Sequence, residues 1–206
     1  MSLDDIYFSV LDFNEDGIGD LVRGELEAGT APSEILNEGL VAALEEVGRC
    51  FSEGTMFVPD MLMAADTMKA GLEVLRPLLT GEAATAKGTV VIGSVRGDMH
   101  DIGKNLVGMM VEGAGFKVVD LGVNVDTNTF ISAAGDNNAD FVLMSALLTT
   151  TMAAMKTTVE AIKAERLSTK VIVGGAPVNA EFAKAVGADG YSDDAPGAAA
   201  LLGTFV

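Results

Sequence analysis

The sequence contains no tryptophan, and aromatic residues make up only 5% of its 206 residues. Its single cysteine, Cys50, excludes an intramolecular disulfide, which is typical of proteins from a reducing compartment. The first 20 residues are acidic and contain no apolar run, so they do not resemble a signal peptide. We therefore expect a cytoplasmic protein, in which Cys50 is a packing residue on a helix face.

Basic residues are also scarce, because 13 lysines and arginines stand against 30 acidic residues and leave a net charge of −17. Such a surface repels the phosphates of nucleic acids and of anionic lipids. No run of 18 apolar residues occurs that could span a membrane. The sequence thus predicts no nucleic-acid and no membrane partner, while its hydrophobic content of 49% is enough for a sizeable core.

The apolar residues before residue 80 recur at the three- and four-residue spacing of amphipathic helices. Two shorter helices are expected over about residues 4–13 and 16–28. Two longer helices are expected near Pro32 and Pro59, since proline is well tolerated in the first turn of a helix. Residues 1–79 are therefore predicted to form a four-helix bundle as a first domain.

The next segment, residues 80–88, is small and polar and is interpreted as a linker. In residues 89–206, short β-branched runs alternate with helical segments, which implies right-handed crossovers and a parallel sheet. Five strands are expected, at residues 89–95, 117–121, 141–145, 170–173 and 190–191. The predicted fold class is α/β, with the helical cap followed by a flavodoxin-like, doubly wound (Rossmann-like) parallel sheet that binds its ligand at the carboxyl ends of the strands.

The only histidine, His100, lies in the loop after the first strand, two residues after Asp98 and three before Gly103. A P-loop has four residues between its first glycine and the Gly-Lys pair, whereas five separate Gly97 from Gly103. The loop also lacks the G-x-G-x-x-G of dinucleotide sites, and one histidine with one cysteine cannot supply the usual zinc ligands. A Ser-His-Asp hydrolase with Ser145 stays open, although Ser145 lacks the G-x-S-x-G elbow.

An axial ligand to a large metallocofactor fits the His100 loop better. A neutral imidazole binds metal through one ring nitrogen, while the other nitrogen donates to a carboxylate that fixes the tautomer. Asp98 is placed to be that carboxylate, and Ser145 is either a hydroxyl that hydrogen-bonds to Asp98 or a helix N-cap. Gly174-Gly175 is either a plain strand-to-helix turn or a slot without side chains that a flat heterocycle could enter.

Taken together, these residues resemble the cobalamin-binding domain of methionine synthase and of the corrinoid proteins of methyltransferase systems. That family carries D-x-H-x-x-G, S-x-L and G-G in this order, which here are residues 98–103, 145–147 and 174–175. Residues 45–49 and 57–65 also resemble the helical cap of the methyl-carrying branch. The resemblance therefore covers both halves of the chain.

The resemblance implies that a cobalamin or related corrinoid binds with its benzimidazole tail extended away from the cobalt. His100 would replace the tail as the lower axial ligand of the cobalt, with Asp98 and Ser145 as a relay behind it, so these three are the expected catalytic residues. The expected cofactor contacts are Gly97, Asp98, Met99, His100, Asp101, Ile102, Gly103, Ser145, Leu147, Thr149, Gly174, Gly175, Tyr191 and Ser192, with Phe57, Met61, Ala65 and Met68 from the cap.

The resemblance further implies a methyl carrier whose corrinoid cycles between cobalt(I) and methylcobalamin. A substrate-specific methyltransferase would load it, an acceptor methyltransferase using a reduced pterin or a thiol would unload it, and a reductive activase would restore oxidised cobalt. The chain would then be a component of a methyltransferase system and not an autonomous enzyme. Two alternatives stay open: a cobalamin-dependent sensor or regulator, and the small subunit of an adenosylcobalamin mutase, against which the helical cap argues.

Overall fold

The computed structural model describes residues 2–78 and 86–206 of the chain. The chain divides into two compact units. The first comprises Met1–Ala86 together with Gly113–Gly115, and the second comprises Lys87–Glu112 and Phe116–Val206. Most of the predicted linker at residues 80–88 lies outside the described residues.

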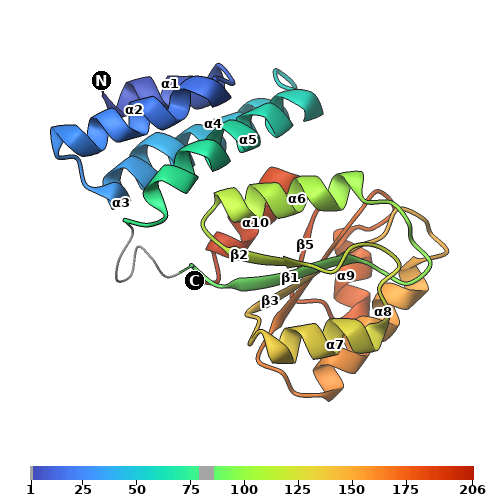
Figure 1. The fold of residues 1–206 in the computed structure, drawn as a ribbon. Helices are drawn as coiled ribbons and strands as arrows, with labels where there is room; N and C mark the ends of the chain where they lie inside the picture. Colours follow the sequence, from blue (N-terminus) through green and yellow to red (C-terminus); the bar gives the residue numbers. More distant parts are fainter. Residues whose placement is uncertain (1, 79–85) are drawn as a thin grey trace. The chain divides into compact units, whose positions relative to one another are not determined.

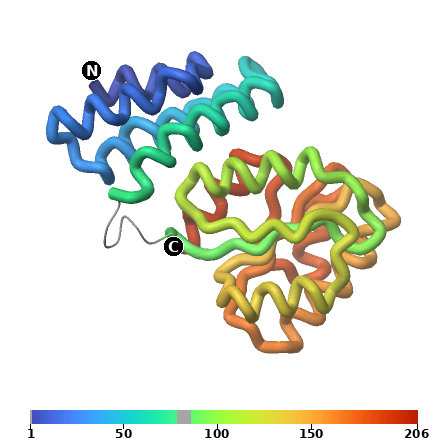
Figure 2. The backbone as a smooth tube through the Cα atoms, viewed as in Figure 1, coloured from blue at the N-terminus to red at the C-terminus, as the bar shows by residue number. Residues whose placement is uncertain are grey.

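The first unit is built from four helical stretches, as the sequence predicts (Figure 1). Its helices are α1 (Leu3–Leu11), α2 (Glu15–Ala28), the unbroken series α3 (Pro32–Glu34), η1 (Ile35–Val41) and α4 (Ala42–Ser52), and α5 (Val58–Leu75). The series from α3 to α4 follows one continuous helical path in the backbone trace (Figure 2). The helical cap of the predicted fold class is thus confirmed.

Local capping explains where these helices begin and end. The Ser2 hydroxyl accepts a hydrogen bond from the Asp5 N–H, and the Asp5 carboxylate accepts one from the Ser2 N–H, which closes a capping box on α1. The side chain of Asn14 caps α2, which ends at Gly29 with a positive φ of 96°. The capping residues therefore separate α1, α2 and α3 at the positions where the chain has to turn.

The stretch η1 is a π-helix, which the apolar spacing does not predict. Its residue Gly39 packs closely against α1, because a Cβ atom added there would lie 3.0 Å from Cγ2 of Ile6. π-Helices are rare and occur mostly as single turns inside α-helices. The absence of a side chain at Gly39 allows η1 and α1 to lie close together.

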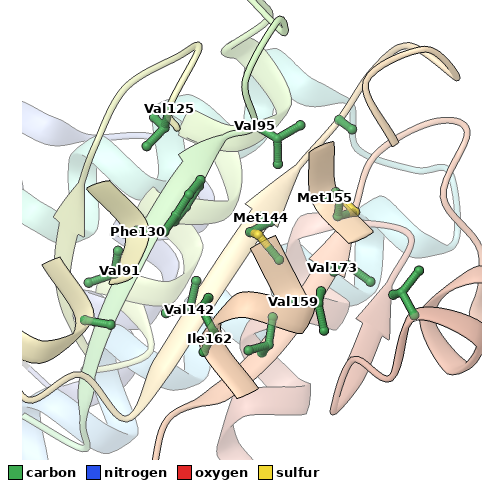
Figure 3. Packing of buried hydrophobic residues seen from close by; sticks show 14 of the residues in the cluster. Val91, Val95, Val125, Phe130, Val142, Met144, Met155, Val159, Ile162 and Val173 are labelled. Carbon is green, nitrogen blue, oxygen red and sulfur yellow. The ribbon is translucent and has the colours of Figure 1, made fainter. Parts of the chain in front are cut away.

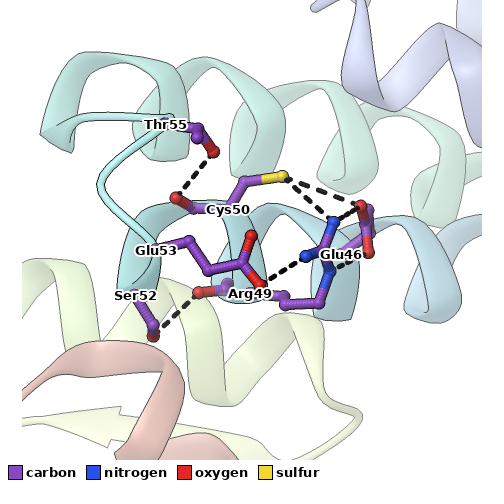
Figure 4. A network of polar contacts seen from close by, with 7 residues as sticks. Glu46, Arg49, Cys50, Ser52, Glu53 and Thr55 are labelled. Atoms are coloured by element: carbon purple, nitrogen blue, oxygen red, sulfur yellow. Dashed lines mark hydrogen bonds and ion pairs between the residues drawn. The ribbon is translucent and has the colours of Figure 1, made fainter.

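The surface of α4 carries a polar network centred on Arg49 (Figure 4). The guanidinium of Arg49 lies 2.5 Å from Oε1 of Glu46 and 2.6 Å from Oε1 of Glu53. The hydrogen bonds from Arg49 lower the pKa of Glu46. All three side chains keep substantial solvent contact, so the network contributes little to stability. Cys50 is half-buried beside it and is a free thiol, in line with its predicted packing role.

The second unit contains a five-stranded parallel sheet in the order β2-β1-β3-β4-β5. Its strands are β1 (Thr89–Ser94), β2 (Lys117–Asp120), β3 (Phe141–Ser145), β4 (Lys170–Gly174) and β5 (Gly190–Ser192). This is the strand order of flavodoxin-like folds, in which the chain reverses its direction of winding between β1 and β3. The predicted doubly wound sheet is confirmed.

Five helices cover the sheet: α6 (Ile102–Gly113), α7 (Thr127–Asp136), α8 (Met152–Ala164), α9 (Ala180–Val186) and α10 (Ala195–Gly203). One hydrophobic cluster lies between the sheet and α7, α8 and α9 (Figure 3). In it, Val142 and Met144 of β3 meet Val159 and Ile162 of α8. In the ribbon, α6 and α10 lie on the opposite face of the sheet (Figure 1). Among the helices of the described residues, none combines the length and apolarity needed to cross a membrane.

The strand register aligns one row of small residues at the carboxyl edge of the sheet. Ser94 of β1 pairs with Ser145 of β3, Ser145 pairs with Gly174 of β4, and Gly174 pairs with Ser192 of β5. This edge is where open parallel sheets bind ligands, next to the point where the winding reverses. The predicted motifs around His100, Ser145 and Gly174 therefore start from neighbouring positions.

Candidate functional site

The loop after β1 joins His100 to Asp98. The Nδ1 atom of His100 lies 2.7 Å from Oδ1 of Asp98. The Asp98 side chain is 1% exposed, whereas the His100 side chain is 50% exposed. A carboxylate can only accept, so Nδ1 carries the proton, and Nε2 of a neutral ring is left with its lone pair. The pair thus presents one nitrogen with a free lone pair at the surface of the sheet's carboxyl edge.

Asp98 is held by four donors. Its Oδ1 atom accepts from the N–H (3.1 Å) and the ring of His100, and its Oδ2 atom accepts from the Leu147 N–H (2.7 Å) and the Thr151 hydroxyl (2.8 Å). Burial pushes the pKa of Asp98 upward, but these hydrogen bonds outweigh it and hold the pKa well below its usual range. Asp98 is therefore ionised at neutral pH despite its burial.

The hydroxyl behind Asp98 belongs to Thr151 and not to Ser145. Ser145 was expected to hydrogen-bond to Asp98, but the bond is made by Thr151. Ser145 is the last residue of β3, and its side chain is half-buried. The turn after β3 instead brings Thr151 next to Asp98 in the loop after β1. The predicted relay is corrected in this respect, because the serine is beside the loop and the threonine is bonded to it.

Two further residues that the sequence analysis did not identify hold the loop. The buried Ser94 hydroxyl donates to the carbonyl oxygen of His100 at 2.6 Å. Asn124 accepts from the Gly97 N–H through Oδ1 and donates its own N–H to the Asp98 carbonyl oxygen, both at 2.8 Å. Asn124 has a φ of 53° and Gly97 a φ of 85°, conformations that asparagine and glycine tolerate best. The available sequence signal was an asparagine two residues after Gly122, in the turn after β2.

The Gly-Gly pair is demanded by the backbone itself. A Cβ atom on Gly175, whose φ is 121°, would lie 2.0 Å from the carbonyl oxygen of Ala146. A Cβ atom on Gly174 would lie 2.9 Å from the carbonyl oxygen of Ser192. Both glycines thus allow the ends of β3, β4 and β5 to approach closely. Because an added Cβ would meet backbone atoms at both positions, this contact accounts for the pair as a tight strand-to-helix turn, and the slot for a flat heterocycle stays a prediction.

Several predicted contact residues lie exposed around this edge. Met99 is 67% exposed, Ile102 is 75% exposed, and Leu147 is also exposed. Met99 and Ile102 lie in the loop that carries Asp98, and the Leu147 N–H donates to Asp98, so three exposed apolar residues gather around one carboxylate. Gly103 borders open space, since a Cβ atom there would meet nothing within 4 Å. Exposed apolar side chains next to Gly103, in the first turn of α6, offer a surface for a large, flat ligand. Asp101 and Thr149 are exposed as well.

Tyr191 and Ser192 lie on β5, at the far end of the same row. Burial, with the neighbouring Asp193 and Asp194, raises the pKa of the Tyr191 phenol, so its hydroxyl stays protonated and can donate a hydrogen bond. The Ser192 hydroxyl donates to the Asp194 carbonyl oxygen at 2.8 Å and so supports the start of α10.

The sequence assigns no role to Arg96, which is exposed. The pKa of Asp126 is lowered mainly by hydrogen bonds from Thr129 and to a smaller extent by the charge of Arg96.

The four predicted cap contacts differ in exposure. Phe57, just before α5, is 65% exposed, whereas Met61, Ala65 and Met68 within α5 are buried. Buried methionines and leucines on a helix are ordinarily core residues. Phe57 is accordingly the one member of this set whose side chain is free to meet a ligand as the structure stands.

The donor set of the site fits a corrinoid. Nowhere in the described part of the chain do three or more His, Cys, Asp or Glu side chains gather as a metal site. A metal bound at Nε2 of His100 must therefore receive its other ligands from elsewhere, and a macrocycle supplies four of them in one plane. The exposed imidazole and the exposed apolar side chains of Met99 and Ile102 beside it are compatible with such a ring.

Comparison with known proteins assigns the family. Residues 88–200 match the family model described as B12 binding domain, and residues 2–76 match a second model of the same description. The chain belongs to the B12-binding corrinoid proteins. The sequence-based resemblance to this family is thereby confirmed.

Relatives and a solved structure agree with this membership. A corrinoid protein of Desulfitobacterium hafniense is 39% identical over 204 residues, which cover 97% of this chain and 94% of the relative. Dimethylamine corrinoid protein 1 of Methanosarcina acetivorans is 43% identical over 181 residues, covering 86% and 83%. The crystal structure of the methanol:cobalamin methyltransferase complex from Methanosarcina barkeri matches with a TM-score of 0.84 and 30% identity, covering 97% of this chain and 77% of that chain.

Family membership gives the His100 pair its context. In a B12-binding corrinoid protein, a lone exposed histidine backed by a buried carboxylate is suited to ligate cobalt. Of the expected site residues, the structure brings Asp98 and His100 into direct contact and places Ser145, Leu147, Gly174 and Ser192 along the same sheet edge. Thr151, Ser94 and Asn124 join the site from the structure alone.

Proposed function

We propose that this corrinoid protein carries a methyl group between partner methyltransferases. The observation that carries the proposal is the His100–Asp98 pair, in which a buried carboxylate fixes an exposed imidazole with its Nε2 atom free. When bound, the corrinoid supplies the cobalt that accepts and releases the methyl group. The relatives support the methyl-carrying role, because they are named as methylamine corrinoid proteins and as part of a methanol:cobalamin methyltransferase complex.

The residues of the chain have distinct roles in this proposal. His100 would hold the cobalt through Nε2, and Asp98 keeps the Nδ1 proton in place and the ring oriented. Met99, Ile102 and Leu147 cover the apolar rim of the corrin and exclude water there. The edge at Ser145, Gly174 and Gly175 holds the extended benzimidazole tail, with Thr149, Tyr191 and Ser192 beside it.

The partners follow from the same proposal. A substrate-specific methyltransferase donates the methyl group, and a second methyltransferase, with a reduced pterin or a thiol as acceptor, removes it. A reductive activase restores cobalt that has been oxidised. The net charge of −17 favours partners whose docking faces are basic.

Anaerobic reconstitution with hydroxocobalamin, followed by desalting and an ultraviolet–visible spectrum, tests the cofactor assignment. We expect about one corrinoid retained per chain with a histidine-ligated spectrum. His100→Ala should retain less corrinoid and give a base-off spectrum. Because the sequence contains one histidine, no other histidine can take over as ligand in this variant. A wild-type protein that folds but retains no corrinoid would contradict the proposal.

A labelled methyl group separates carrier from sensor. The reconstituted protein is reduced with titanium(III) citrate, treated with isotopically labelled methyl iodide and desalted. A carrier retains the label and releases it to a thiol when an acceptor methyltransferase is added. A protein that instead binds adenosylcobalamin preferentially and loses it on illumination would be the sensor considered above.

A further inference from the structure

Asn124 contacts the His100 loop through two groups at once. Its side-chain Oδ1 atom accepts from the Gly97 N–H, and its own backbone N–H donates to the Asp98 carbonyl oxygen, both at 2.8 Å. The two bonds join Asn124 to the outer N–H and the outer carbonyl group of the dipeptide Gly97-Asp98. Only Met99 separates this dipeptide from His100, so its orientation decides where the loop carries the histidine.

The contact with Gly97 determines how the Asn124 amide is turned. An N–H group can only donate, so the side-chain oxygen of Asn124 faces Gly97 and the NH2 group faces away. An aspartate would offer the same acceptor, whereas a glycine would offer none. The bond to Gly97 is therefore specific to the side chain, while the bond to Asp98 belongs to the backbone and needs only an N–H at position 124.

The backbone of both partners explains why this side-chain bond matters. Asn124 has a φ of 53°, in the left-handed region that asparagine, aspartate and glycine adopt most readily. Gly97 has a φ of 85° and, as a glycine, can adopt many other backbone conformations at little cost. The Oδ1 atom of Asn124 thus restrains the residue of the loop that is least restrained by its own chemistry.

The turn that carries Asn124 is itself fixed to β1. The Ser94 N–H donates to the Gly122 carbonyl oxygen at 3.0 Å, and the Val125 N–H donates to the Ser94 carbonyl oxygen at 2.9 Å. The Gly122 N–H in turn donates to Oδ1 of Asp120 at 2.8 Å. Asn124 therefore reaches the loop from a segment that is hydrogen-bonded on both sides of it.

We infer that Asn124 is a positioning residue for the axial ligand. Asp98 holds the imidazole ring, whereas Oδ1 of Asn124 holds the backbone at Gly97 and so sets the direction in which the loop presents His100. The inference rests on the proposed function of His100 as the cobalt ligand. It makes ligation of the cobalt depend on the turn after β2 as well as on the loop after β1.

Three substitutions separate the side-chain bond from the backbone. Asn124→Gly removes Oδ1, tolerates the φ of 53° and keeps the backbone bond to Asp98. Asn124→Asp keeps an acceptor for the Gly97 N–H. Asn138→Gly is the matched control, because Asn138 is also exposed, has a φ of 47° and lies just after α7. Within the described residues, Asn138 makes no hydrogen bond to the His100 loop.

The first experiment needs no corrinoid. Hydrogen exchange of the Gly97 amide is followed by NMR in the unloaded protein. Loss of one hydrogen bond changes a local equilibrium by about 3- to 10-fold, so the Gly97 amide should exchange faster by about this factor in Asn124→Gly. Asn124→Asp and Asn138→Gly should exchange at the wild-type rate, and all variants should unfold at similar urea concentrations. Unchanged Gly97 exchange in Asn124→Gly would overturn the inference.

The second experiment measures the axial ligand directly. Each variant is titrated with hydroxocobalamin and then reduced to cobalt(II), and its electron paramagnetic resonance spectrum is examined for splitting by an axial nitrogen. Asn124→Gly should bind about 3- to 10-fold more weakly and show the nitrogen splitting in a smaller fraction of the cobalt. Asn124→Asp and Asn138→Gly should match wild type in both measurements.

The outcomes separate this inference from the proposed function. If wild type retains no corrinoid, the proposed function fails and the inference fails with it. If wild type is histidine-ligated and Asn124→Gly shows the same nitrogen splitting, only the role of Asn124 is overturned. Equal losses in Asn124→Gly and Asn138→Gly would assign the effect to the backbone freedom of glycine. Equal losses in Asn124→Gly and Asn124→Asp would assign it to local packing, and either result also overturns the inference.

Discussion

The Nδ1 atom of His100 lies 2.7 Å from Oδ1 of Asp98, and the exposed ring thereby rests on a carboxylate that has almost no contact with solvent. Burying a carboxylate is unfavourable unless its oxygens are hydrogen-bonded. Here the oxygens are satisfied by donors from two separate loops, at residues 100 and 147–151. The pair therefore depends on the fold of the sheet edge as much as on the D-x-H spacing.

Replacing Asp98 with alanine should destabilise the protein even without cofactor. The change leaves the backbone N–H groups of Leu147 and His100 without this acceptor, while the Thr151 hydroxyl keeps the Leu148 carbonyl oxygen, and unsatisfied buried groups cost about 1–3 kcal/mol each. We expect the free energy of unfolding, measured by urea denaturation, to fall by about 2–3 kcal/mol. The neighbouring Asp101 is exposed, and Asp101→Ala should change it by less than about 0.5 kcal/mol. Equal effects of the two variants would refute the structural role of Asp98.

Gly175→Ala should prevent the sheet edge from closing. The added Cβ would lie 2.0 Å from the Ala146 carbonyl oxygen, and the φ of 121° is unfavourable for any L-residue with a side chain. We expect a loss of more than about 3 kcal/mol in thermal or urea unfolding. A leucine at position 174 would likewise disturb the sheet edge, because its Cβ would lie 2.9 Å from the Ser192 carbonyl oxygen. Gly174→Leu is therefore not a clean test of the predicted slot for the benzimidazole tail. Wild-type stability of Gly175→Ala would show that this edge is arranged differently.

Gly103→Ala should have opposite effects on stability and on corrinoid binding. Gly103 lies in the first turn of α6 with nothing within 4 Å of an added Cβ, and alanine favours helix, so the unfolding free energy should rise by about 0.5 kcal/mol. The methyl group would enter the space proposed for the corrin, so retention of hydroxocobalamin after desalting should decrease. Gly135→Ala on α7, also in open space, is the matched control and should leave retention unchanged.

The ion pair between the buried Lys104 and the exposed Asp120 offers a test of the second unit. Lys104 Nζ lies 2.5 Å from Oδ2 of Asp120, and the lysine side chain is 1% exposed. Asp120→Ala leaves the ammonium group buried with Asn105 as its remaining partner, and should cost about 3 kcal/mol in unfolding. Lys104→Met removes the buried charge as well and should cost about 1 kcal/mol or less. If Lys104→Met were the more damaging change, the pair would be net stabilising.

Much of the architecture follows from spacing in the sequence. Alternating β-branched runs and helices predict the parallel sheet and its strand order, and the prolines at 32 and 59 stand in the first turns of helices as expected. The π-helix η1 is not predictable in this way, because its apolar residues have the spacing of an ordinary α-helix. The close packing of Gly39 against Ile6, two residues that are far apart in the chain, is likewise not visible in the spacing.

The site shows a similar division between local and long-range information. The spacing of Asp98 and His100 predicts their contact, since a short loop brings residues two apart together. Whether Ser145 or Thr151 reaches Asp98 depends on the path of residues 146–151, which spacing does not determine. Asn124 likewise meets Gly97 and Asp98 only because β2 lies beside β1.

The hydrogen bonds of Ser94 and Asn124 bear on how a ligand would be captured. They restrain the His100 loop through backbone atoms while the binding face is still bare. The conformational entropy of this loop is thus lost during folding and need not be lost again on association, which favours affinity through preorganisation. Hydrogen-exchange rates of the loop amides should accordingly be similar before and after loading with corrinoid.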